Sequence, residues 1–494
     1  MKTFLAAFSC LALFILLSSC PSLTKRCDHD LGVNCGNDCP GGCPDTCCCS
    51  GCDVDTCQVS FCEGCCCVEG VECWNDTCSG KPGFVCQGCC CEEGVECGTD
   101  TCAHKPGFKC QGCYCEVGVN CLTDTCNRTF EKYFGGAGTD TGWAIAATND
   151  GGYLLTGSYR NPTSLDYNIY LIKIDSLGNQ KFARNSIYGS ATDQEYGVDV
   201  MELSDKDLLI LGNKNKGGTN WQLFLVRTDK DGIKRWEKDF GLTKLDLGFS
   251  FIQKTGGSGF LMYGYTETYV AANPSRGIES IIFESTTDGT AGTRSNIGGT
   301  NDDYGSCIEV ANDGNYLLLT TIGKVPGPGH KLMLYKLDQS LTVLWQKEVI
   351  TSCIPNQRGC VRRMPGGDGY LIAGAPLGGD MRLVHVDNNG DGGLNSDNYI
   401  SILDVGVEHS ISVIVLKDGN YAAVSDGMTL VKVRHDLTQV MWQKDFEAST
   451  SGVHAILEAA DGGLVIVGTK YNTANSSADL YVIKTDENGE LQTK

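Results

Sequence analysis

Basic residues and long apolar segments are scarce in this sequence. Of its 494 residues, 39 are lysine or arginine and 60 are aspartate or glutamate, so the formal net charge is −21 at pH 7. A chain this acidic lacks the basic surface that phosphate binding requires, which argues against a nucleic-acid partner. After the apolar residues 4–17, no segment is long and apolar enough to predict a transmembrane helix. Charged residues make up 20% of the chain and hydrophobic residues 41%, as in globular proteins, so wholesale disorder is excluded as well.

Motifs of common enzyme families are absent too. The sequence has no G-x-S-x-G elbow, no Walker loop and no H-E-x-x-H motif. Five histidines follow residue 127 without the spacing of metal ligands: His330, His385, His409, His435 and His454. These absences argue against an enzyme.

Cysteine, in contrast, is abundant and unevenly distributed. Of the 31 cysteines, 26 lie between Cys27 and Cys126, and cysteine nearly vanishes after residue 127, where Val, Ile, Leu, Tyr and Gly take over. This change in composition predicts a cysteine-rich segment, residues 20–126, followed by a separate domain, residues 127–494.

The N-terminus has the pattern of a secretion signal. Lys2 precedes the apolar residues 4–17, a run that is too short to span a bilayer comfortably. The sequence Leu-Ser-Ser-Cys that ends at Cys20 resembles the lipobox of bacterial lipoproteins. This resemblance implies that residues 1–19 are a signal peptide, that Cys20 carries a lipid, and that the protein is held on a membrane of the bacterial cell envelope. We expect the outer membrane; the leaflet stays open, and ordinary secretion is the alternative.

The cysteine-rich segment repeats every 24 residues. The sequence C-C-C-V-E-G-V-E-C-W-N-D-T-C begins at Cys65, and related copies begin at Cys89 and Cys113. Because a repeat contains almost no aliphatic residues, burial alone does not offset its chain entropy, and cross-links are needed. We expect disulfides in an oxidising compartment; a metallothionein-like cluster of thiolates with zinc or copper is the alternative. The disulfide candidates, whose pairing the sequence leaves open, are Cys65, Cys66, Cys67, Cys73, Cys78, Cys86, Cys89, Cys90, Cys91, Cys97, Cys102, Cys110, Cys113, Cys115, Cys121 and Cys126.

A second repeat, of about 52 residues, follows residue 127. Its first copy contains D-G-G-Y-L-L-T-G at residues 150–157, and related sequences begin at residues 205, 257, 313, 367, 418 and 461. An Asp-Gly turn between two short β-rich runs predicts a β-hairpin. Most copies continue with two further strands, and four strands in a unit of this length are typical of a β-propeller blade.

The sequence also predicts how the ring of blades closes. The seventh copy shows no fourth strand, whereas residues 129–136, ahead of the first copy, match one. We therefore predict an all-β fold, a seven-bladed β-propeller preceded by a small disulfide-rich repeat segment. Over residues 129–494 the repeat resembles the D-G-G-Y type of secreted bacterial propeller. The resemblance implies a binding or scaffold role.

Four acidic residues stand at the starts of first strands: Asp140, Glu195, Asp246 and Asp303. They allow a partial anionic ring at the channel mouth, which would hold a cation or steer a basic partner. Alternatively, each carboxylate caps backbone amides of a turn. We favour the caps, because the last three copies have no clear equivalents.

One turn resembles a calcium loop. Asp387, Asn389, Asp391 and Asn395 fit the pattern D-x-N-x-D-G-x-x-N, in which oxygen ligands alternate around one point. The resemblance makes calcium the one candidate cofactor. However, the twelfth position is Asn398 rather than glutamate, so a longer hairpin turn is the favoured alternative.

The tryptophans and the three cysteines that follow residue 127 predict packing contacts and a disulfide. Trp236, Trp345 and Trp442 are expected to pack between neighbouring blades, as similar tryptophans do in quinoprotein dehydrogenases. Cys353 and Cys360 are candidates for a disulfide, and Cys307 for a small buried thiol.

Together these features predict a lipid-anchored protein of the bacterial cell envelope that acts as a binding or scaffold module. The expected partner is a protein assembly at the outer membrane or a surface glycan. The alternatives are a carbohydrate-active or quinoprotein-like propeller enzyme and a metallothionein-like metal-binding N-terminal segment.

Overall fold

The computed structural model divides the chain into two compact units, Met1–Cys126 and Asn127–Lys494. It describes residues 108–111, 114–117, 129–182, 186–190, 192–241, 245–267, 277–299, 301–323, 329–353, 358–377, 380–393, 398–402, 411–425, 429–446 and 452–491. No helix within these residues is long and apolar enough to cross a membrane.

The described part of the first unit is one antiparallel hairpin, formed by β1 (Phe108–Gln111) and β2 (Tyr114–Val117). Its register places Cys110 opposite Cys115. The other cysteines predicted to form disulfides in this unit, and Cys20, lie outside the described residues.

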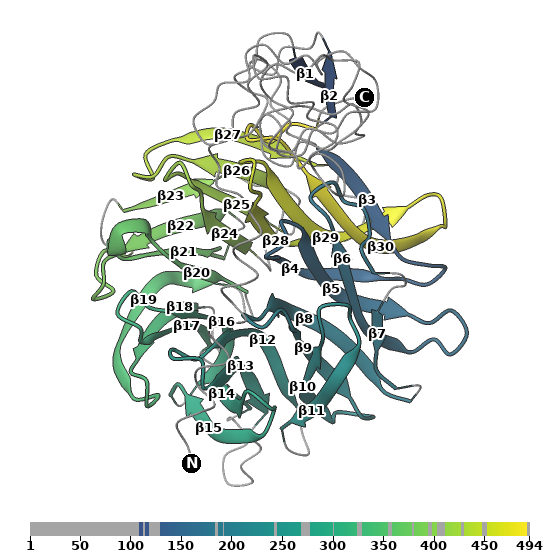
Figure 1. The fold of residues 1–494 in the computed structure, drawn as a ribbon. Coiled ribbons are helices and arrows are strands. Elements are labelled where there is room, and N and C mark those ends of the chain that lie inside the picture. Colours follow the sequence, from purple (N-terminus) through teal and green to yellow (C-terminus); the bar gives the residue numbers. More distant parts are fainter. Residues whose placement is uncertain are drawn as a thin grey trace, which may run out of the picture. The chain divides into compact units, whose positions relative to one another are not determined.

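The second unit contains seven four-stranded antiparallel sheets arranged in a ring (Figure 1), which confirms the predicted seven-bladed β-propeller. Blade 1 consists of β4 (Thr141–Ala147), β5 (Tyr153–Arg160), β6 (Tyr167–Ile174) and β7 (Ser186–Tyr188), and blade 2 of β8 (Gln194–Glu202), β9 (Leu208–Asn215), β10 (Trp221–Thr228) and β11 (Lys234–Phe240). Blade 3 consists of β12 (Asp246–Gln253), β13 (Gly259–Glu267), β14 (Ile278–Thr286) and β15 (Ala291–Ile297), and blade 4 of β16 (Asp302–Val310), β17 (Tyr316–Gly323), β18 (His330–Leu337) and β19 (Val343–Cys353).

The last three blades follow the same order, and blade 5 also holds a single 3₁₀ turn, η3 (Pro365–Gly367). Blade 5 consists of β20 (Cys360–Arg363), β21 (Tyr370–Gly374), β22 (Met381–Val386) and β23 (Tyr399–Ile402), and blade 6 of β24 (Ile411–Val415), β25 (Tyr421–Ser425), β26 (Thr429–Val433) and β27 (Val440–Asp445). Blade 7 consists of β28 (Val453–Glu458), β29 (Leu464–Asn472), β30 (Ser477–Lys484) and β3 (Phe130–Phe134).

The ring closes as the sequence predicted. Strand β3 pairs antiparallel with β30, with Phe130 opposite Lys484 and Phe134 opposite Leu480. An N-terminal strand of the propeller therefore completes its last blade. The first strand of each blade contacts the first strands of its neighbours, and β4 contacts both β8 and β28, so these seven strands surround the central channel.

The hydrophobic core lies between adjacent blades. Second and third strands have neighbours on both faces of their sheet, so they are nearly continuous apolar runs; Leu154, Leu155 and Ile169 are fully buried. One cluster joins blade 7 to blade 1 and includes Tyr170 and Val482. Because no blade covers both of its own faces, each one depends on its two neighbours.

The aspartate of the repeated Asp-Gly turn forms an ion pair with a largely buried lysine of the third strand. The Nζ–carboxylate distances are 2.9 Å for Lys173–Asp150, 2.8 Å for Lys336–Asp313, 2.9 Å for Lys432–Asp418 and 2.5 Å for Lys484–Asp461. In blade 3 the charges are exchanged, and Lys254 of the turn side pairs with Glu284 of β14 at 2.8 Å. A buried ammonium group requires such a partner, so these aspartates have a structural role.

Aromatic residues of one blade pack on a glycine in the next blade, which confirms the predicted position of the three tryptophans. The glycines have φ between 76° and 81° and lie in the turn between the third and fourth strands. The ring–glycine pairs are Phe130–Gly178, Trp236–Gly289, Trp345–Gly390 and Trp442–Gly489.

Candidate functional site

The two faces of the propeller differ because consecutive strands are antiparallel. The first strands begin on one face, which also carries the turns between second and third strands; we call it the entrance face. The Asp-Gly turns and the turns between third and fourth strands lie on the other face, called here the turn face.

Three of the four acids at the entrance of the first strands accept hydrogen bonds from backbone amides, and the fourth, Asp246, lies 3.6 Å from Arg294 Nη2. They are all buried, with at most 1% of each residue exposed: Asp140, Glu195, Asp246 and Asp303. The carboxylate of Asp140 accepts hydrogen bonds from Arg160 N and Gly136 N, both at 2.7 Å. Asp303 accepts one from Gly299 N at 2.8 Å. Burial raises the pKa of Asp140 to about 6 and that of Glu195 to about 7. The favoured interpretation is confirmed for Asp140, Glu195 and Asp303, and because all four carboxylates are buried they do not form an open ring of charge.

A β-bulge recurs in five of the first strands. In each, the pairing with the second strand shifts register by one residue near the entrance face, which leaves one residue unpaired. A bulge re-aims the side chain of its extra residue. The five bulged residues are Trp143, Val198, Phe249, Ser306 and His454.

Two of these side chains contact Arg358 in the channel, and a third stacks on one of the two. The Arg358 guanidinium carbon lies 4.7 Å from the ring centre of Trp143 and 4.2 Å from that of Phe249. Trp143 also stacks on His454, with ring centres 4.0 Å apart and 21° between their planes. The four residues come from blades 1, 3, 5 and 7 and approach one another across the channel. We call them the channel cluster.

The channel cluster holds a positive charge without an anionic partner among the described residues. Burial lowers the pKa of Arg358 to about 10, so the guanidinium stays protonated at neutral pH. Burial and the nearby charge of Arg358 lower the pKa of His454 to about 3, so its ring is neutral. No ion pair within the described part of the chain involves Arg358.

Further aromatic side chains line the same face. Tyr196 of the first strand of blade 2 has its ring centre 5.2 Å from that of Tyr167 and 5.7 Å from that of Trp221. On blades 3 and 4, Tyr265 and Tyr304 have ring centres 5.2 Å apart. We call these five residues the aromatic band; all except the buried Tyr265 are partly exposed. Their rings offer an apolar surface with hydroxyl and indole N–H groups at its edge.

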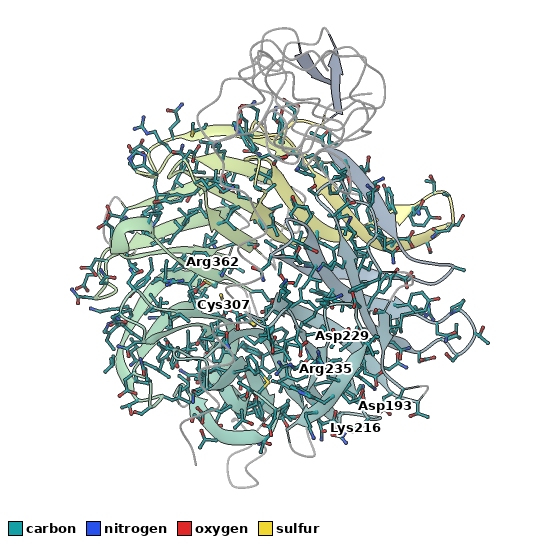
Figure 2. All side chains as sticks on the ribbon, viewed as in Figure 1. Asp193, Lys216, Asp229, Arg235, Cys307 and Arg362 are labelled. Atoms are coloured by element: carbon teal, nitrogen blue, oxygen red, sulfur yellow. The ribbon has the colours of Figure 1, made fainter. Side chains whose placement is uncertain are left out.

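Two cysteines lie together in the hydrophobic core between blades 4 and 5. Cys307 of β16 accepts hydrogen bonds from Val361 N at 3.5 Å and from Arg362 Nη1 at 3.8 Å, and Figure 2 shows Cys307 and Arg362 close to each other. A hydrogen bond between the thiols of Cys307 and Cys360 lowers the pKa of Cys360 and raises that of Cys307. Nearby, burial raises the pKa of Asp199 to about 7.

The predicted disulfide between Cys353 and Cys360 is wrong in this structure, where both residues are free thiols. Cys353 ends the outer strand β19 and pairs with His330, whereas Cys360 begins the inner strand β20 of the next blade. Short separation along the chain therefore does not bring the two side chains together. Cys307, at 5% exposure, is the buried thiol that was predicted.

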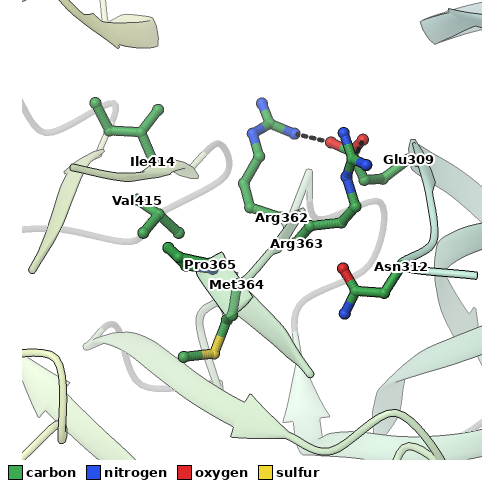
Figure 3. Close-up of a pocket in the computed structure, with 8 residues that line it drawn as sticks. All are labelled: Glu309, Asn312, Arg362, Arg363, Met364, Pro365, Ile414 and Val415. Atoms are coloured by element: carbon green, nitrogen blue, oxygen red, sulfur yellow. Dashed lines mark ion pairs between the residues drawn. The ribbon is translucent and has the colours of Figure 1, made fainter. Parts of the chain in front are cut away.

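A pocket of about 460 Å³ opens between blades 4, 5 and 6, where their first strands end (Figure 3). Its lining residues are Glu309, Asn312, Arg362, Arg363, Met364, Pro365, Ile414 and Val415. Arg362 Nη1 and Arg363 Nε already lie 3.7 Å and 3.9 Å from the carboxylate of Glu309. The charges of this pocket are thus partly compensated within it.

The two carboxylates of the calcium-like turn, Asp387 and Asp391, already bind groups of the protein itself. Asp387 Oδ1 accepts hydrogen bonds from Asn389 N at 2.8 Å and Asp391 N at 2.9 Å. Asp391 Oδ1 pairs with Lys347 Nζ at 2.5 Å. Asn395 lies outside the described residues. This geometry favours the hairpin turn, and calcium binding stays a prediction.

The same turn in blade 7 supports that assignment. Asp486 Oδ1 accepts hydrogen bonds from Asn488 N at 2.9 Å and from Glu490 N at 2.8 Å, and Glu490 pairs with Lys444 of the neighbouring blade. The two turns differ in sequence but use equivalent contacts.

Sequence reasoning missed the channel cluster. Trp143, Phe249 and His454 occupy equivalent bulges, so an alignment of the copies around their first strands offered a signal. No such alignment points to Arg358, because the fifth copy of the repeat departs from the common pattern around this residue. No family model and no curated protein matches this chain.

Proposed function

We propose that this protein is a binding or scaffold module of the bacterial cell envelope, anchored on the outer membrane by a lipid on Cys20. The entrance face of the propeller is its binding surface. The observation that carries this proposal is the channel cluster, where the unpaired guanidinium of Arg358 lies beside the partly exposed rings of Trp143 and Phe249.

The contacts of the buried acidic residues favour a binding protein over an enzyme. A propeller enzyme would need acids or histidines that converge on one channel mouth. Here three of the four buried acids of the entrance face are held by backbone amides, as Asp140 is by Arg160 N and Gly136 N. In the described part of the chain, no three His, Cys, Asp or Glu side chains gather in a way that could hold a metal ion.

The anchor and the cysteine-rich segment fit the same role. Two or more acyl chains hold a protein on a membrane much more firmly than one chain does. Residues 20–126, cross-linked by disulfides, would separate the lipid from the propeller. Thiol titration under denaturing, non-reducing conditions tests this spacer: many free thiols, or bound zinc, would instead support the metallothionein-like alternative.

A pull-down with the native lipid anchor tests the binding surface. Gentle detergent extraction of the wild-type protein should recover a partner or a glycan. The Trp221→Ser/Tyr167→Ser variant, which removes two of the five rings of the aromatic band, should lose this partner. Ile233→Ser is the matched control, because Ile233 is 67% exposed but lies on the turn face. Recovery of only monomer from the wild type, or equal capture by both variants, would argue against this surface.

A further inference from the structure

We infer that the channel cluster binds the carboxylate of an acidic sugar, with Arg358 as the residue that pairs with it. The inference rests on the proposed binding function and names its ligand. It concerns the four residues Trp143, Phe249, Arg358 and His454, all of which the structure describes.

The position of the guanidinium determines how a ligand can approach. The Arg358 guanidinium carbon lies over the rings of Trp143 and Phe249, 4.7 Å and 4.2 Å from their centres, so the guanidinium packs against two aromatic rings. An aromatic ring accepts no conventional hydrogen bond, so the five N–H donors in the plane of the group stay available to a ligand. A planar carboxylate approaching along that plane forms two parallel hydrogen bonds, the strongest geometry for this pair. Arg358 is partly exposed, so solvent reaches it in the channel.

The unpaired positive charge of Arg358 favours the binding of an anion. A cation that is partly removed from water and has no partner is costly, and proteins pair such groups. The chain carries 60 acidic residues, yet none of the described ones forms an ion pair with Arg358. A carboxylate from a ligand would supply the missing charge.

A second polar group of the cluster is also without a partner in the described part of the chain. The Nδ1 atom of His454 is buried and has no hydrogen bond. Because the ring is neutral, each nitrogen can either donate or accept, depending on the tautomer. A hydroxyl group next to the carboxylate would satisfy it, since a hydroxyl both donates and accepts.

The surroundings favour a sugar as the carrier of the carboxylate. The aromatic band extends from the channel cluster along the same face, because Phe249 lies 5.3 Å from Tyr265, which in turn contacts Tyr304. Flat rings of this kind can pack against the C–H faces of a pyranose. The net charge of −21 disfavours a polyanion and suits a ligand with a single negative charge.

Binding of D-glucuronate to the full chain tests this inference. Titration calorimetry should detect glucuronate binding but no binding of D-glucose, which lacks the carboxylate. Arg358→Gln should weaken the affinity about 10-fold or more, the value of a charge-assisted hydrogen bond, and Arg358→Lys should weaken it less. Arg363→Gln on the turn face is the matched control and should bind like wild type.

A measurement on the unmodified sequence covers the case in which Arg358→Gln does not fold. Phenylglyoxal modifies accessible guanidinium groups, and peptide mapping reports each site. Glucuronate should protect Arg358 and leave Arg363 unprotected. Equal modification of Arg358 with and without glucuronate would overturn the inference.

Two other probes separate the sources of an anion. If inorganic phosphate or an N-acetylated dipeptide with a free carboxylate protects Arg358 and glucuronate does not, the acidic-sugar assignment is wrong. If the aromatic band captures a partner in the pull-down while glucuronate does not bind, the inference fails and the proposed binding function stands.

Discussion

The indole ring of Trp345, in the outer strand of blade 4, packs directly on Gly390 of blade 5. A Cβ atom on Gly390 would lie 2.7 Å from Cζ3 of the ring. In blades 4 and 6 the equivalent turn position is Leu341 and Leu437, with φ of 65° and 57°. Both leucines follow a blade whose outer strand, β15 or β23, has no tryptophan. The residue in this turn is therefore glycine where a ring covers it and a larger side chain where none does.

Replacing this glycine should weaken the contact between blades. Gly390 has φ 77°, and Gly151, with φ 79°, has no atom within 4 Å of an added Cβ. Gly151→Ala should cost about 1 kcal/mol of unfolding free energy for its backbone conformation alone. Gly390→Ala should cost a further 1 to 3 kcal/mol, roughly, from overpacking against the ring.

Thermal or urea unfolding measures both variants, and a double variant isolates the ring. In the Trp345→Leu background, Gly390→Ala should cost less than in wild type, and the remaining excess over Gly151→Ala comes from Lys347 Cγ, 2.8 Å from the added Cβ. Equal costs of the two alanine substitutions in the wild-type background would contradict the proposed contact.

Glu195 should make stability depend on pH. Burial raises its pKa from 4.5 to about 7, so the folded state favours the neutral carboxyl. The stability from this preference is present below pH 4.5 and is lost as the pH rises through about 7. Glu195→Gln removes the titration, so wild type should lose on the order of 2 kcal/mol more than the variant between pH 4.5 and pH 8.

Urea unfolding at several pH values gives this difference. Because Lys214, 3.6 Å from Glu195, stays charged over the whole range, its own titration adds nothing to the pH dependence. Parallel curves for wild type and Glu195→Gln would show that Glu195 is ionised throughout.

Oxidation should cross-link Cys307 to Cys360, because their thiols share a hydrogen bond. Diamide takes up the two electrons and two protons that the thiols lose when the S–S bond forms. Peptide mapping should find this cross-link in wild type and lose it in Cys307→Ser. Cys353→Ser is the control and should retain it. A Cys353–Cys360 peptide would instead restore the pairing expected from the sequence.

Cys20 should determine membrane attachment. In a bacterial host, wild type should fractionate with membranes and incorporate labelled palmitate, because the lipid is the expected anchor. Cys20→Ser should do neither. Cys10→Ser, a substitution within the expected signal peptide, is the matched control and should behave like wild type; membrane attachment of both variants would contradict the lipid anchor.

Calcium should leave the melting temperature unchanged. Asp387 already accepts two backbone hydrogen bonds and Asp391 is paired with Lys347, so an ion would have to displace both sets of contacts. Differential scanning with calcium and with a chelator measures the effect. A calcium-dependent rise that disappears in Asp391→Asn would establish the calcium site.

The local and periodic features of this propeller follow from the amino-acid sequence alone. Asp-Gly turns, strand patterns and the seven copies depend on residues close together in the chain, so they could be read without a structure. The displaced strand β3 was also readable, because the last copy showed a gap that residues 129–136 match. The cap role of Asp140 was expected on the same grounds.

Which side chains meet in the channel depends on how the blades pack in three dimensions. Trp143 and Arg358 are more than two hundred residues apart in the sequence and come into contact because the ring closes. Cys360 contacts Cys307 of the neighbouring inner strand and not Cys353, which is nearer in the chain. A periodic pattern specifies which strand a residue occupies. Contacts across the channel depend instead on how seven twisted sheets pack around one axis, and on the bulges that turn single side chains toward it.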